Sequence, residues 1–546
     1  MTDRNTEPGA HTDEAANTNG TANADGRANT GQNAKAGQTA NTDRNANTGR
    51  RANTDRSADT GGRANTGRRA STGRRASRLS RRSVLAGMGS VPLAAGAASA
   101  SVPSGRPATA GRAAGEEGAR RTTLLQNASL VLTMDRRQGS GELGSVEHGD
   151  VLLRDGKITA VGRRLRAPAG TRVRDVTGKL LMPGFVDVHN HLWQSSIRGG
   201  CSDQDLVGWL ASCNRPTLPK IGAADMYRFV HLAALDALRT GVTTVVDWVH
   251  AIPYATSESY VRALDDAGLR FVYAMATAPG DEGAVRKVKR ELLDPLPLAS
   301  AQVSVHAGME GVRELRASWK VARDLGLMVN SHVLEHRSDR EAGQVRALRE
   351  VGAFGPALLM NHAIHLTREE IALTGDRGVR VAHCPLSNMR LASGVMPLPR
   401  LHRHGVTAGL GHDGGTNDTS DMFALMKTAV GLQRAVHEDA EVYPTLPAVL
   451  RMATLGGAEA VGMDDQVGSL TPGKRADVLV LDPGTLNFAP RTDWTSQLVL
   501  NGQPPNVTDI YVDGRLRKTR GALVGVDEAE VVHQAELAAS HLERAT

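Results

Sequence analysis

Cysteine, aromatic residues and long apolar runs are scarce in this chain of 546 residues. It has three cysteines, Cys201, Cys213 and Cys384, and no two of them form a C-x-x-C pair. Cysteines this few and scattered exclude a disulfide framework, a thiolate zinc site and a thioredoxin-like redox site. No apolar run reaches the length of about 18 residues that a membrane-spanning helix needs, which excludes a conventional transmembrane helix.

The positive charge of the chain is concentrated in its first part. Residues 1–121 hold 19 Lys and Arg against 10 Asp and Glu, a net charge of +9. Residues 122–546 hold 46 against 48, a net charge of −2. A body so close to neutral excludes a basic nucleic-acid-binding protein, so we expect no nucleic-acid partner.

Residues 1–77 repeat a degenerate six-residue phrase, as in RANTDR (51–56), RANTGR (63–68) and RASTGR (69–74). The phrase contains no aromatic residue and no apolar period, which predicts a disordered low-complexity leader. The alternative is that the start codon is misassigned and this stretch is not translated.

Residues 78–100 combine Arg81-Arg82, a mildly apolar stretch and Ala98-Ser99-Ala100. This order is typical of a secretory signal, and the paired arginines resemble a twin-arginine signal peptide. It predicts export of the folded protein by the twin-arginine machinery to a secreted or extracytoplasmic location. The mature chain would begin near Ser101, with residues 101–121 as a linker.

Two β-rich flanks surround a long middle section. Asp155-Gly156 and Asp513-Gly514 each lie between β-type runs, the strongest short-range hairpin signal. We therefore expect a small β-sandwich domain built from residues 122–181 and 465–526. An amphipathic helix is expected at 527–546, packed on its own chain or on a second copy in a homo-oligomer.

The middle section, 182–464, alternates β-branched apolar runs with helical patterns. Eight such runs fit the α/β class and a (β/α)8 TIM barrel. An open doubly wound sheet is disfavoured because no G-x-G-x-x-G follows the first strand. The predicted strands are 184–188, 243–248, 270–276, 302–305, 328–331, 357–361, 379–382 and 407–411.

Polar residues recur where these predicted strands end, which is the catalytic face of such barrels. His189 and His191 fall on one side of the first strand because side chains alternate. His332 ends the fifth strand, His362 the sixth, and Asp413 follows the eighth. A single histidine is more often packed or solvated, but recurrence at strand ends predicts one shared site.

These motifs resemble the amidohydrolase superfamily over roughly residues 122–525. Within it, the chain is similar to triazine hydrolases, guanine and cytosine deaminases and adenosylhomocysteine deaminases. The matching stretches are PGFVDVHNH (183–191), NSHVLE (330–335), MNHAIHL (360–366), AHCPLSNM (382–389), GLGHDG (409–414) and GSLTPGKRAD (468–477).

The resemblance implies one divalent metal ion, Zn²⁺ or alternatively Fe²⁺, and four ligands for it. No lysine occurs in the predicted fourth strand, where two-metal members carry a carboxylated lysine. The resemblance further implies general acid catalysis by Glu335, stabilisation of the attacking oxygen by His362 and proton acceptance by Asp413. The implied ligands are His189, His191, His332 and Asp413.

The substrate-binding expectations are less direct. Gln194 stands in H-x-H-x-x-Q spacing, as in guanine deaminases, and its carboxamide can pair with a ring amide. Trp193 and Trp209 can offer flat faces to a heterocycle, although a Trp near a barrel rim packs in the core at least as often, and we assign Trp193 to substrate binding. Arg198, His306 and Ser387 also lie near the expected barrel mouth. His412 replaces the small residue or Thr that usually precedes the final Asp.

Together these features predict a metal-dependent hydrolase that deaminates a small heterocyclic substrate of the purine, pyrimidine or triazine type. The alternative is the same site expelling chloride or an alkylamine, or opening a cyclic amide. A distant alternative is an exported metal- or solute-binding protein without turnover. A binder has no use for the proton shuttle that Glu335 would supply.

Overall fold

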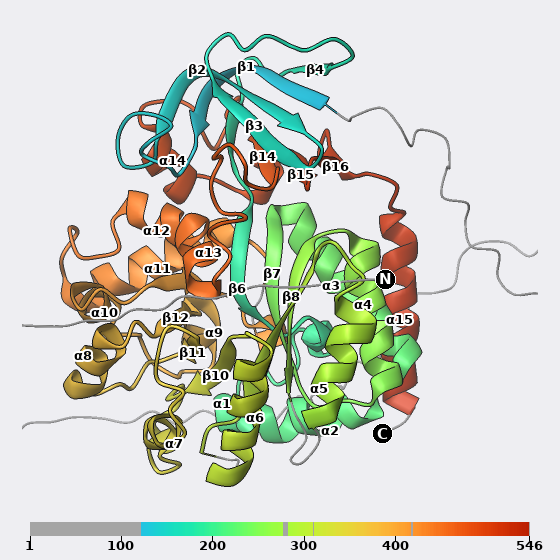
Figure 1. The fold of residues 1–546 in the computed structure, drawn as a ribbon, viewed down its shortest axis with the longest axis vertical. Coiled ribbons are helices and arrows are strands. Elements are labelled where there is room, and N and C mark those ends of the chain that lie inside the picture. The colour runs from blue at the N-terminus through green and yellow to red at the C-terminus, as the bar shows by residue number, and fades with distance from the viewer. Residues whose placement is uncertain (1–121, 277–281, 309–310, 417–418, 545–546) are drawn as a thin grey trace, which may run out of the picture. The chain divides into compact units, whose positions relative to one another are not determined.

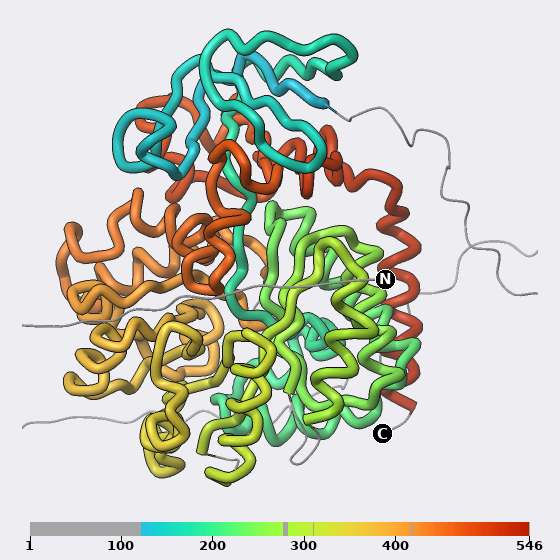
Figure 2. Tube along the Cα trace, viewed as in Figure 1, coloured from blue at the N-terminus to red at the C-terminus, as the bar shows by residue number. Residues whose placement is uncertain are grey.

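A computed structural model describes residues 122–544, except 277–281, 309–310 and 417–418 (Figures 1 and 2). The described residues belong to one compact unit, Pro107–Thr546. The predicted leader (1–77), signal peptide (78–100) and linker (101–121) lie outside the described residues.

Eight parallel strands form the barrel, and each pairs with the next strand in the sequence. All eight predicted strands are confirmed, with boundaries shifted by a few residues. The strands are β6 (Phe185–Asn190), β7 (Val242–Val249), β8 (Arg270–Ala276), β9 (Ala299–Val305), β10 (Val329–Val333), β11 (Leu358–His362), β12 (Arg380–His383) and β13 (Ala408–Leu410).

The barrel closes where β13 meets β6. The backbone N–H of Asp413 donates to the carbonyl of His189 at 2.9 Å. Gly409 of β13 allows the close approach, because a Cβ there would lie 2.5 Å from a methyl group of Val188. This seam brings the two ends of the barrel sequence, and their predicted metal ligands, side by side.

Helices cover the outer face of the strands because their apolar residues recur at helical spacing. Helix α3 (Ala223–Thr240) buries Met226, Phe229 and Ala233 and ends at Gly241, whose φ is +112°. The other helices of the barrel are α4 (Tyr254–Ala267), α5 (Glu282–Val288), α6 (Val312–Asp324), α7 (Gln344–Glu350), α8 (Arg368–Asp376), α9 (Pro385–Arg390), α10 (Leu398–Arg403), α11 (Met422–His437), α12 (Leu446–Met452) and α13 (Leu455–Val461).

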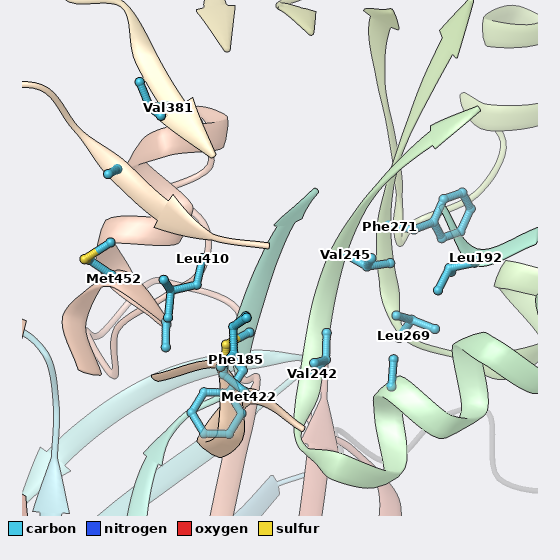
Figure 3. Close-up of a cluster of buried hydrophobic side chains, with 14 of the residues drawn as sticks. Phe185, Leu192, Val242, Val245, Leu269, Phe271, Val381, Leu410, Met422 and Met452 are labelled. Carbon is cyan, nitrogen blue, oxygen red and sulfur yellow. The ribbon is translucent and has the colours of Figure 1, made fainter. Parts of the chain in front are cut away.

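Strand alternation divides the apolar core into two parts. Val245 and Phe271 belong to the large cluster between strands and surrounding helices (Figure 3). Val246 and Val272, one position further along, belong to a second cluster on the opposite face. Strands β7 and β8 therefore contribute apolar side chains to both the barrel interior and the helical layer.

The two β-rich flanks form one nine-stranded sheet. Strand β5 pairs antiparallel with β14, which joins the N-terminal and C-terminal halves, and Lys157 pairs with Arg475 near the sheet's edge. Both predicted Asp-Gly hairpin turns are present, with positive φ at each Asp and Gly. The strands are β1 (Thr122–Leu132), β2 (Ser145–Arg154), β3 (Lys157–Gly162), β4 (Arg172–Asp175), β5 (Leu180–Pro183), β14 (Val478–Leu481), β15 (Val507–Val512), β16 (Arg515–Thr519) and β17 (Ala522–Leu523).

Specific polar contacts connect this sheet to the barrel. Arg270 of β8 pairs with Asp477, just before β14, at 3.1 Å, and both side chains are 3% exposed. Lys518 of β16 donates to the carbonyl of Arg239, at the end of α3, at 2.7 Å. The sheet is thus fixed to the barrel by three buried side chains, those of Arg270, Asp477 and Lys518.

Helix α14 (Trp494–Leu500) precedes the last strands, and α15 (Glu528–Arg544) ends the described chain. Helix α15 runs beside α3 (Figures 1 and 2), where His541 lies 3.0 Å from a carboxylate oxygen of Asp225. The expected C-terminal helix therefore packs on its own chain. Among the described residues, no helix has both the length and the apolar character needed to cross a membrane.

Candidate active site

Four side chains predicted as metal ligands converge at the ends of β6 and β10 and just after β13. One nitrogen or oxygen atom from each lies within 4.8 Å of the others. His189 Nε2 is 3.0 Å from Asp413 Oδ1, and His191 Nε2 is 3.3 Å from His332 Nε2. The group brought together is His189, His191, His332 and Asp413.

The histidines of this group present neutral, electron-donating nitrogens. Burial lowers the pKa of both His189 and His191 to about 3, and that of His332 well below its usual range. Nδ1 of His191 lies 2.7 Å from the carbonyl of Trp248, so it carries the proton and donates it. Nε2 of His191 therefore directs its lone pair toward the centre of the group, as a metal ligand must.

The group fits a divalent ion on structural grounds. The ring nitrogens of His189 are buried and have no hydrogen-bond partner among the described residues, although Nε2 faces the Asp413 carboxylate. Buried polar atoms without hydrogen bonds are rare in folded proteins and call for an explanation. Three imidazoles and one carboxylate that leave a coordination position for water suit Zn²⁺.

Glu335 and His362 lie beside the metal-binding group. Glu335 Oε2 is 3.4 Å from His362 Nε2, which is 3.9 Å from Asp413 Oδ2. Burial, together with the nearby Asp413 and Asp339 carboxylates, raises the pKa of Glu335 well above its ordinary value. Glu335 is therefore a carboxylic acid that keeps its proton at a pH where exposed carboxylates have lost theirs.

Asn388 orients the His362 ring. Its Nδ2 lies 2.9 Å from His362 Nδ1, and an amide nitrogen can only donate, so His362 Nδ1 accepts. The proton of the neutral imidazole is then on Nε2, which faces Glu335 and Asp413. His362 and Asp413 both have positive φ, 67° and 66°, a backbone conformation that is uncommon outside glycine and clusters at functional sites.

A cavity of about 220 Å³ opens onto this group. The metal-binding His191, His332 and Asp413 line it together with Glu335. On another side it is lined by a run of short helical turns, namely α1 (Leu206–Trp209), a π-turn (Leu210–Asn214) and the start of α2 (Arg215–Thr217). The labels of α1 and α2 in Figure 1 mark this region, at the end of the barrel away from the nine-stranded sheet.

The residues predicted to bind substrate divide into two groups. Gln194 and His306 line the cavity, and the Gln194 side-chain oxygen accepts the N–H of Gly415 at 3.1 Å. The structure places the other three elsewhere. Trp193 is buried at 1% exposure, Arg198 pairs with Asp236 at 3.1 Å, and Ser387 Oγ donates to the carbonyl of Cys384.

Of the two tryptophans that the sequence offered as a flat face for a heterocycle, Trp209 lines the cavity and Trp193 packs in the core. Asn214 and Arg215 follow Trp209, and no motif marked them. Cys201 and Cys213 form a disulfide bond across this same stretch, although scattered cysteines had given no expectation of one.

The model of the amidohydrolase family matches residues 180–517. A 5'-deoxyadenosine deaminase of Methanosarcina mazei is 32% identical over 440 residues, covering 77% of this chain and 98% of the relative. A 5-methylthioadenosine/S-adenosylhomocysteine deaminase of Syntrophomonas wolfei is 30% identical over 439 residues, covering 77% of this chain and 99% of the relative.

Solved structures have the same fold. An adenosine deaminase from Xanthomonas campestris with bound zinc has a TM-score of 0.68 and 29% identity, covering 77% of this chain and 98% of its own. An atrazine chlorohydrolase from Arthrobacter aurescens complexed with zinc has a TM-score of 0.70 at 22% identity, covering 76% and 100%. The second likeness bears on the fold alone.

Proposed function

This chain belongs to the amidohydrolase family, and we propose that it is a metal-dependent aminohydrolase whose substrates are adenine nucleosides. The observation that carries the proposal is the buried Glu335, whose pKa burial raises, beside His362 and Asp413 in a cavity that the metal-binding group also lines. Relatives that deaminate adenine nucleosides match this chain over most of its length. The adenine ring of their substrates is therefore the ring on which we expect this chain to act.

Deamination replaces an amine on a ring carbon with oxygen from water and releases ammonia. The reaction needs an activated water molecule, a proton for the ring nitrogen and a proton for the leaving amine. His189, His191, His332 and Asp413 would hold the ion, for which zinc is our assignment. Such an ion would lower the pKa of a water molecule to about 7.

The remaining steps belong to side chains of this chain. Asp413 accepts the proton that the water loses, and Glu335 donates its own proton to the ring nitrogen beside the attacked carbon. The Nε2–H of His362 donates to the attacking oxygen and stabilises the tetrahedral intermediate. Glu335 then takes the remaining proton of that oxygen and passes it to the leaving amine. The proton held by Asp413 restores the acid form of Glu335.

The cavity offers groups suited to a nucleoside. Trp209 supplies a flat apolar face for the ring. Gln194 and His306 supply hydrogen-bonding atoms for the ring edge, and Asn214 and Arg215 can bind hydroxyl groups of a sugar. We assign these residues to substrate binding on the basis of their place in the lining.

We also propose that the protein is exported by the twin-arginine pathway. The support is the order of the elements in residues 78–100 and the Cys201–Cys213 disulfide, a bond that persists in oxidising compartments. Cell fractionation of the wild type and of an R81K/R82K variant tests this. Retention of the variant in the cytoplasm is expected, and equal export of both would contradict the proposal.

The deamination proposal is tested by ammonia release from purified protein loaded with zinc or with iron. The panel contains adenosine, 5'-deoxyadenosine and S-adenosylhomocysteine, followed by guanine, cytosine, triazines and pterins. We expect release from the adenine nucleosides, and release at least about a hundredfold slower with a Glu335→Gln variant. Chloride or acid products would instead indicate the dehalogenase or cyclic amidase alternative, and a metal-loaded protein without turnover on any compound would indicate a binding protein.

A further inference from the structure

A disulfide bond links two residues of the stretch that forms one side of the cavity. Cys201 and Cys213 are separated by 12 positions in the sequence, and their Cα atoms are 6.3 Å apart. We call residues 201–215 the wall segment. Its cavity-lining members are Leu206, Trp209, Leu210, Asn214 and Arg215.

Most of the wall segment is one short helical stretch, because α1 (4 residues), the π-turn (5) and α2 (3) follow one another without a gap. A helix shorter than about 12–15 residues is marginal in isolation, because few hydrogen bonds offset the cost of ordering the backbone. The position of the segment must therefore depend on contacts with the rest of the chain.

Those contacts are concentrated at α9, next to the barrel. The Arg390 guanidinium donates to the carbonyls of Gly200 and Cys201 at 3.1 and 3.3 Å. Leu391 packs with Leu206 and Trp209 in a small cluster that is separate from the main core. The Cys201 end of the wall segment is thus attached to α9. Through the disulfide, the Cys213 end, beside Asn214, is attached to α9 as well.

We propose that the Cys201–Cys213 disulfide is a positioning device for substrate binding, so that substrate affinity depends on the redox state of this cysteine pair. This inference takes the identity of the substrate, an adenine nucleoside, from the proposed function. The metal-binding group and Glu335 lie outside the wall segment, on and after the barrel strands. Loss of the disulfide therefore raises KM and leaves kcat nearly unchanged, because a loop fixed in its bound conformation improves affinity.

The redox step is the exchange of the disulfide with a dithiol. The dithiol gives two electrons and two protons, the Cys201–Cys213 S–S bond breaks into two thiols, and the dithiol becomes a cyclic disulfide. Cys201 and Cys213 are both partly exposed, so a small reductant reaches them. Cys384 is buried, and burial raises the pKa of its thiol well above the usual range, so it stays inert in the folded protein.

The first test counts thiols in the full chain, purified from an oxidising compartment and denatured without reductant. One free thiol, that of Cys384, is expected. Three free thiols would overturn the proposal, because the bond would then be absent from the protein. This measurement is independent of activity and of the substrate.

The second test compares the wild type with a C201S/C213S double variant, both zinc-loaded. We expect faster hydrogen exchange in residues 201–215 of the variant, and a KM for the best adenine nucleoside about tenfold higher, with kcat within about twofold and equal zinc content. A dithiol should reproduce the KM increase in the wild type and change nothing in the double variant, which is the matched control.

The outcomes separate this proposal from the proposed function. If neither protein releases ammonia, the proposed function fails, and the exchange rates still decide whether the disulfide holds the wall segment. Unchanged exchange would overturn the positioning role. An active pair with equal KM, or a kcat that falls together with metal content, would also overturn it.

Discussion

The carboxylate of Asp187 accepts a hydrogen bond from Nδ1 of His412 at 3.0 Å, and this pair links the first and last strands of the barrel. The other oxygen of Asp187 accepts the backbone N–H of His412 at 3.1 Å, and both side chains are buried. Asp187 lies two positions before His189, and His412 directly precedes Asp413. The pair therefore fixes the backbone that carries two of the proposed metal ligands.

An Asp187→Asn substitution is expected to weaken zinc binding about 10–100-fold, the scale seen when groups supporting metal ligands are removed. The variant leaves His412 without its carboxylate partner and loosens the seam between β6 and β13. Competition with a chromophoric chelator measures the affinity. Asp236→Asn, at the Arg198 ion pair outside the cavity, is the matched control and should bind zinc normally. Equal zinc affinity in the wild type, the Asp187→Asn variant and the Asp236→Asn variant would contradict the prediction.

A Glu335→Gln substitution should retain the metal and lower turnover by about two or more orders of magnitude, the scale of general acid–base catalysis. Gln is nearly isosteric with Glu but has no acidic proton to give to the ring nitrogen. Ammonia release and metal content are measured on the same sample. Near-normal turnover in a fully metal-loaded variant would remove Glu335 from the mechanism.

A His332→Ala substitution should abolish stoichiometric metal binding, because one of four ligands is lost. Elemental analysis of the purified protein measures this. His402→Ala is a suitable control, since His402 stacks on Tyr443 with ring centroids 3.7 Å apart and is not part of the metal-binding group. A His332→Ala protein with a full complement of zinc would show that the ligand assignment is wrong.

Asp247 predicts a specific pH dependence of stability. Burial raises its pKa to about 7, and the carboxyl accepts hydrogen bonds from the Leu192 N–H and the Tyr260 hydroxyl. The unfolded chain has a pKa near 3.9, so the native state binds the extra proton between these values. This contribution to stability is fully present below about pH 4 and is lost as the pH rises through about 7.

An Asp247→Asn substitution replaces the protonated carboxyl with a neutral amide that does not titrate. The variant therefore does not lose this contribution to stability as the pH rises. The free energy of unfolding of the variant minus that of the wild type should be about 2 kcal/mol larger at pH 8 than at pH 5.5. Urea unfolding of both proteins at the two pH values gives the difference, in which the titration of the buried histidines cancels. If the free energies of unfolding of the variant and the wild type differed by the same amount at pH 5.5 and at pH 8, Asp247 would be ionised in the native protein at both.

The fold class and the barrel strands could be predicted from local periodicity in the sequence. The four proposed metal ligands could be predicted because the motifs around them resemble those of the amidohydrolase superfamily. Side-chain alternation places His189 and His191 on one face of a strand, and the ends of parallel strands in a barrel meet at one rim. A residue at a strand end, such as His332, His362 or Asp413, is therefore assigned to the site as soon as its strand is recognised.

Which residues surround the metal-binding group depends on how distant parts of the chain pack together. The sequence offers both Trp193 and Trp209 as a flat face for the substrate, yet Trp193 packs in the core and Trp209 lines the cavity. The position of the wall segment is fixed by Arg390, Leu391 and a disulfide, contacts that its own helical pattern does not specify. Contacts such as Asn388 with His362, or Asp187 with His412, join residues far apart in the chain, and local pattern carries no information about such distances.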